Sequence, residues 1–211
     1  MVPELGRGVA AELTELTSAV RAAVATLPSQ WIVIGVGPRD DRIGADAVGT
    51  FAGYGADLPV ALGPHACAAP RELPLCALIA GWLRGQLDPA ATLDVRVLAE
   101  DLSAQAAADR GRELRGRTSG AGVLVVADGA HTLTPAAPGG FDPDSVAVQR
   151  QWDDALAAGD TDMLASVSGG VLGRVAYQVL AGLAGPEPVA TELYRGAPYG
   201  VGYFVGTWVS P

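Results

Sequence analysis

The chain has 211 residues and 49% of them are hydrophobic, which suits one large domain with a sizeable core. Its formal net charge is −9 at pH 7, and this argues against nucleic acid or an anionic membrane as a partner, since both attract basic surfaces. The apolar runs are too short to span a bilayer and the N-terminus lacks the layout of a signal peptide, so we expect a cytoplasmic protein.

The first half of the chain predicts helices and strands in alternation. Apolar residues at steps of three and four predict an amphipathic helix over 3–27. The run 31–37 predicts a buried strand that leads into a charged loop over 38–42. Residues 43–57 are expected to be irregular. The elements expected after them are a short strand over 57–63, a helix over 74–87, a strand over 93–98 and a helix over 103–116.

An apolar run from Gly122 ends in Asp-Gly-Ala-His and predicts a central strand that delivers His131 into the next loop. Ligands of open α/β sheets bind outside the carboxyl ends of such strands. The pattern therefore predicts an α/β fold with a central, mostly parallel or mixed sheet flanked by helices on both faces, in a single domain over 1–211. The remaining elements expected are helices over 142–158, 161–168 and 171–184, and strands over 189–194 and 201–209.

Two weaker patterns follow the first predicted strand. Gly35-Val36-Gly37 lacks the third glycine of a dinucleotide-binding loop, so a tight turn is the better interpretation. The stretch from Ile34 to Gly44, with its glycine pair, acidic pair and glycine, resembles the opening motif of hydrogenase maturation proteases. That resemblance implies nickel held by carboxylates and a histidine, and it is kept as a minor alternative.

The stretch Asp128-Gly129-Ala130-His131-Thr132-Leu133, followed by Phe141-Asp142, resembles the LigB-like family of class III extradiol ring-cleavage dioxygenases. The segment 197–205 resembles the ending of an actinobacterial branch of that family. The resemblance implies the family's α/β fold and cleavage of a catechol ring by non-haem Fe(II), held by two histidines and one carboxylate. It implies that His131 is the catalytic acid/base and not an iron ligand.

The chain departs from the family at both ligand histidines. Met1–Leu5 resembles the segment just past the family's Pro-His-Pro turn, so the first strand and its histidine are expected to be absent. The second ligand belongs to a Pro-His pair, and here the pair is Pro38-Arg39. An arginine does not lose its proton to bind a metal. The resemblance leaves Glu192 as a candidate carboxylate, but it predicts no intact metal site and no resident cofactor.

We therefore expect a degenerate relative that binds a small, anionic molecule or serves as an interaction scaffold. His131 is its catalytic residue if activity survives, and the expected ligand-binding residues are Arg39, Asp128 and Tyr199. The alternative for Arg39 is an ion pair with Asp40, Asp41 or Asp128.

An enzyme remains the second hypothesis: a Fe(II) dioxygenase completed by further N-terminal residues, or another metal-dependent enzyme with altered ligands. His65, in a Gly-Pro loop, is expected on the surface. A homo-oligomer is also expected, because a missing edge strand leaves unpaired backbone groups for a second subunit to cover.

Overall fold

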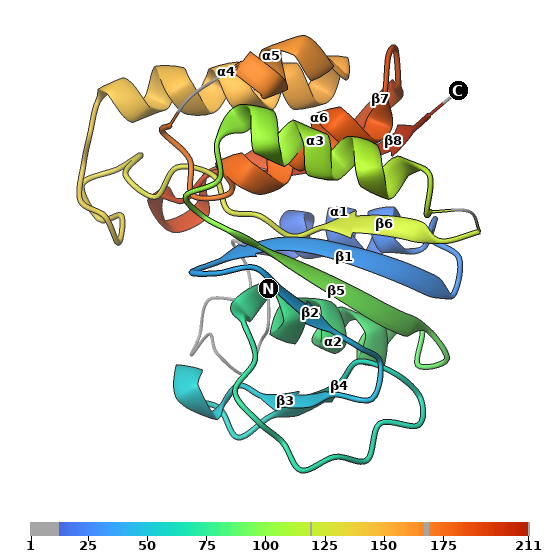
Figure 1. Ribbon diagram of the computed structural model, residues 1–211. Helices are drawn as coiled ribbons and strands as arrows, with labels where there is room; N and C mark the ends of the chain where they lie inside the picture. The colour runs from blue at the N-terminus through green and yellow to red at the C-terminus, as the bar shows by residue number, and fades with distance from the viewer. Residues whose placement is uncertain (1–12, 119, 167–168, 211) are drawn as a thin grey trace.

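The computed structural model describes residues 13–118, 120–166 and 169–210, which fold around a mixed four-stranded sheet (Figure 1). The strand order is β2-β5-β1-β6. Three strands are parallel: β5 (Thr92–Ala99), β1 (Gln30–Gly37) and β6 (Gly122–Val125). The short β2 (Asp41–Ile43) runs antiparallel along the outer edge of β5. The expected α/β class with a mixed sheet is confirmed.

Helices cover both faces of the sheet, as expected. The helices α1 (Thr14–Val24) and α2 (Leu75–Leu87) lie on one face, where Trp31 and Val33 of β1 join their apolar cluster. On the other face lie α3 (Ala104–Arg115) and α6 (Arg174–Ala184), which pack with Ile34. Successive side chains of a strand point to opposite faces, so β1 contributes apolar side chains to the clusters on both faces of the sheet.

Two further helices and two hairpins surround this core. The helices α4 (Asp144–Ala158) and α5 (Thr161–Ser166) pack beside α6 in an apolar cluster around Trp152. One hairpin joins β3 (Val48–Thr50) to β4 (Pro59–Ala61), with the 3-10 turn η2 (Ala52–Tyr54) between them. The other joins β7 (Val189–Gly196) to β8 (Tyr203–Val209) through η3 (Pro198–Gly200). Within the described ranges, no helix is long and apolar enough to cross a membrane.

Three sequence expectations need correction. The strand that carries His131 is not central: β6 forms an edge of the sheet and all four of its residues are half-buried, while β1 lies in the middle. The ranges 38–42 and 43–57 are not wholly irregular, because they contain β2 and β3. The first helix is described only from Thr14, and residues 3–12 of the expected helix lie outside the described residues.

Gly35 has a packing role instead of the expected turn. It lies inside β1, which continues to Gly37. A Cβ atom at this position would overlap the side chain of Cys76 on α2. The missing side chain therefore sets how closely α2 approaches the sheet.

Candidate functional site

The loop after β6 is fixed by backbone hydrogen bonds to the turn before β8. Gly129 N–H donates to the carbonyl of Gly202 at 3.2 Å, and Gly202 N–H donates to Ala130 at 2.8 Å. Leu133 N–H donates to the carbonyl of Gly200 at 3.1 Å. His131 therefore sits on a segment held at both sides, at the carboxyl edge of the sheet where β1 and β6 both end (Figure 1).

Asp128 is the electrostatic centre of this edge. Burial raises the pKa of its carboxyl group above the ordinary value, and the neighbouring charge of His131 acts in the opposite direction. Burial also raises the pKa of Tyr177 on α6 and that of Tyr203 on β8, and the charge of Asp128 adds to both shifts. One carboxyl, one imidazole and two phenols therefore lie within electrostatic reach of one another.

The imidazole of His131 packs against Gly139. A Cβ atom at position 139 would overlap the ring and would lie 2.6 Å from Nε2. Gly139 N–H also donates to the His131 carbonyl at 3.0 Å. The loop thus closes over its own histidine, and only a residue without a side chain fits beside the ring.

A buried amide links this loop to α4. Gln149 Oε1 accepts a hydrogen bond from Ala130 N–H at 2.7 Å, and Gln149 Nε2 donates to Asp153 Oδ1 at 2.8 Å. Burial is the main cause that raises the pKa of Asp153 to about 6. The sequence pattern alone did not mark Gln149, Asp153 and Tyr177 as site residues. The available signal was polar side chains on the apolar faces of α4 and α6, where a polar group needs a partner.

The structure places Arg39 on an exposed loop directly after β1. No ion pair joins it to Asp40, Asp41, Asp128 or any other described residue. Asp40 is committed elsewhere, because its Oδ1 accepts from Ala99 N–H at 2.8 Å and its Oδ2 lies 3.5 Å from Arg110 Nη2. Among the described residues, Arg39 therefore does not form the ion pair that was the alternative to ligand binding.

The other predicted residues are dispersed. Tyr199 lies in η3, is 40% exposed and has a positive φ of 57°, a backbone conformation that costs free energy for a residue with a side chain. Glu192 lies on β7 and pairs with Arg195 at 2.7 Å. His65 is exposed in the loop after β4, as expected.

The His, Cys, Asp and Glu side chains of the described residues do not form the set of ligands that iron needs. The Fe(II) of extradiol dioxygenases needs two histidines and a carboxylate on one face of the ion. Within the described part of the chain, no group of three or more His, Cys, Asp or Glu side chains is arranged to hold a metal ion. The family's iron chemistry therefore has no site among these residues.

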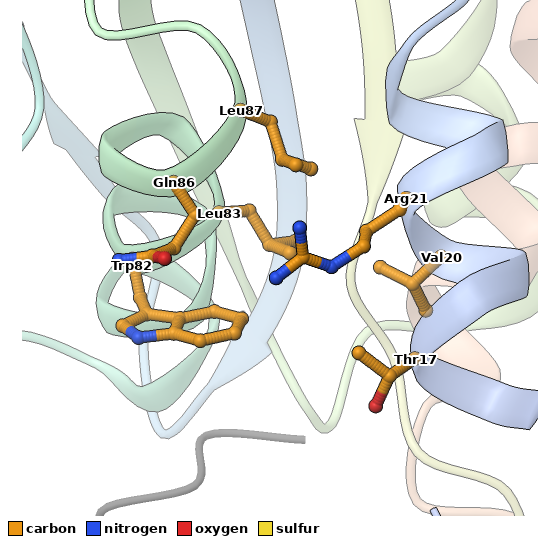
Figure 2. Close-up of a pocket in the computed structure, with 7 residues that line it drawn as sticks. All are labelled: Thr17, Val20, Arg21, Trp82, Leu83, Gln86 and Leu87. Atoms are coloured by element: carbon orange, nitrogen blue, oxygen red, sulfur yellow. The ribbon is translucent and has the colours of Figure 1, made fainter. Parts of the chain in front are cut away.

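A second feature, between α1 and α2, is too shallow to enclose a ligand. Figure 2 shows it, with Arg21 extending from α1 toward Leu83 on α2. Its surface is apolar and it lies away from the His131 loop. We assign it no role in the site.

The fold defines this chain as a mixed α/β protein. No family model matches it, and no curated protein matches it. Among solved structures, it is similar to the crystal structure of an uncharacterized protein, JW3007, from Escherichia coli K12, with a TM-score of 0.56 and 15% sequence identity. The match covers 92% of this chain and 91% of that chain. At this identity the likeness concerns the fold alone.

Proposed function

We propose that this chain is a degenerate member of the LigB-like family which binds a small organic acid at the carboxyl edge of the sheet and does not cleave rings with iron. The observation that carries the proposal is the half-buried carboxyl of Asp128 within electrostatic reach of His131, on the loop after β6. The stretch from Asp128 to Leu133 is also the one that resembles the family. The proposed site is therefore the loop that, under this resemblance, corresponds to the one carrying the family's catalytic histidine.

The side chains around this loop suit an aromatic acid. Phe141 and Tyr199 are exposed, at 53% and 40%. Both belong to segments that are hydrogen-bonded to the His131 loop, through Asp142 N–H to Thr132 and through Leu133 N–H to Gly200. Aromatic side chains offer a flat apolar surface, and an imidazole N–H offers a hydrogen-bond donor to a carboxylate. Arg39, free of ion pairs with described residues, adds a cation at the same edge of the sheet.

Calorimetric titration tests this proposal with benzoate and catechol as probes. We expect benzoate to bind, and we expect His131→Ala to weaken binding by about tenfold or more. His65→Ala is the matched control, since it removes the other histidine from an exposed loop. Failure of benzoate to bind, or equal affinity in His131→Ala and the wild type, would overturn the proposal.

Anaerobic titration with Fe(II) tests the enzymatic alternative on the same samples. Tight Fe(II) binding together with oxygen-dependent cleavage of catechol would favour the dioxygenase and contradict a degenerate site. Under the proposal, benzoate binding is the same with and without Fe(II).

A further inference from the structure

A separate hollow lies at the opposite, amino edge of the sheet, with a volume of about 510 Å³. Its walls come from the starts of β1 and β5, from β2 and from the segment before β6. Small-molecule sites commonly have volumes of roughly 300–1,000 Å³. The hollow is therefore large enough for a small organic molecule, and the His131 loop takes no part in it.

Arginine dominates the charge of this hollow. Its charged lining residues are Arg42, Asp94 and Arg117. Asp94 is doubly paired: Arg42 Nε and Nη2 donate to its two oxygens at 3.0 and 3.1 Å, and Arg96 Nη2 donates at 2.7 Å. Burial opposes ionisation of Asp94, but these two arginines hold its pKa below the ordinary value. The arginines thus neutralise the charge of Asp94, and the hollow keeps a net positive charge in a chain whose net charge is −9.

Hydrogen-bond donors also remain available there. The guanidinium of Arg117 is exposed and makes no hydrogen bond or ion pair with any described residue. Arg42 uses Nε and Nη2 for Asp94, which leaves Nη1. Arg96, which also binds Asp94, has a buried Nε without a hydrogen-bond partner within the described ranges. Buried donors without partners are uncommon in folded proteins.

We propose that this amino-edge hollow is a second ligand site, which takes a small organic anion with its carboxylate or phosphate on Arg42 and Arg117 and its apolar part against Ile32. Guanidinium groups bind both head groups through paired, charge-assisted hydrogen bonds. The proposal does not depend on the function proposed for the His131 loop.

The test is a titration with phenyl phosphate and, separately, hexanoate, followed by calorimetry and by the backbone amide signals of Ile32 and Arg42 in NMR spectra. We expect at least one probe to bind and to shift these amide signals. Arg117→Ala and Arg42→Ala are expected to weaken binding by about tenfold. Arg71→Ala, which removes an exposed arginine elsewhere, is the control for net charge and is expected to bind like the wild type.

The two probes distinguish the head groups. Binding of phenyl phosphate alone assigns the site to phosphate-bearing ligands, and binding of hexanoate alone assigns it to carboxylates. The proposal is overturned if neither probe binds, if the amide signals of Ile32 and Arg42 do not move, or if Arg117→Ala and Arg42→Ala bind as well as Arg71→Ala.

Discussion

Asp128 and Asp153 owe their raised pKa values to where the fold places them. The loop that carries His131 has an ordinary sequence for the end of a strand, and a histidine there is often only a surface residue. Its distinguishing feature is the half-buried carboxyl of Asp128 near it, together with the Gln149 amide that ties the loop to Asp153. Gln149 and Asp153 come from α4 and not from the loop.

Asp153 makes the stability of the protein depend on pH. Its pKa rises from 3.8 to about 6 on folding, so the protonated form is favoured in the native state. Its contribution to stability is therefore fully present below about pH 4 and is lost as the pH rises through about 6. Asp153→Asn keeps an acceptor for Gln149 Nε2 and removes the charge. We expect this variant to be more stable than the wild type at neutral pH, by on the order of 2 kcal/mol.

Urea unfolding at about pH 4 and about pH 8 measures this difference. The two proteins should have similar stability at the lower pH. Asp154→Asn is the control, since Asp154 is an exposed neighbour that pairs with Arg195 at 2.6 Å and is expected to change stability little. A variant Asp153→Asn that is less stable than the wild type at about pH 8 contradicts the argument.

At the scale of elements, the contact between α2 and β1 depends on Gly35. A methyl group there would overlap Cys76, and neither backbone can retreat without opening the core. We expect Gly35→Ala to lower the free energy of unfolding by about 2 kcal/mol. Gly85→Ala, on α2 with open space around its Cβ position, should instead raise stability by about 0.5–1 kcal/mol. Denaturant unfolding of both variants decides this, and equal stability of Gly35→Ala and the wild type counts against the packing role.

The sequence predicted the elements whose signals are local. β1, β5, α2 and α3 follow from apolar periodicity, and Ser103 caps α3 as expected, since its Oγ accepts from Ala106 N–H at 3.2 Å. β2 was missed because its residues are charged, and what stabilises it is a cross-strand pair between Arg42 and Asp94, 52 residues apart. A pattern of neighbouring residues in the sequence does not show a contact between residues so far apart.

The candidate site was predicted only in part, for the same reason. Asp128 and His131 were found because they follow an apolar run. Gln149 and Tyr177 reach the loop from α4 and α6, so only the folded chain shows that they belong to it. The order of strands was equally hidden, because a buried apolar run looks the same at the centre and at the edge of a sheet.

At the scale of the whole molecule, β6 is an edge strand made of apolar residues, and all four of them are only half-buried. Edge strands of this kind pair readily with another chain unless a charge or proline blocks them. We therefore predict a homodimer, which light scattering coupled to gel filtration detects as twice the mass of one chain. Val123→Lys places a charge on this strand and should shift the equilibrium toward the monomer. A wild type that stays monomeric across a wide concentration range contradicts this prediction.

The two edges of the sheet give the molecule two separate candidate sites, and the proposed function concerns the carboxyl edge. The most direct test is an NMR titration of the wild type with benzoate, followed through the backbone amides. We predict that the largest shifts fall on Gly129, Ala130, His131 and Gly202, which form the clamped loop. Shifts confined to the residues of the amino-edge hollow, or no shifts at any residue, would contradict it.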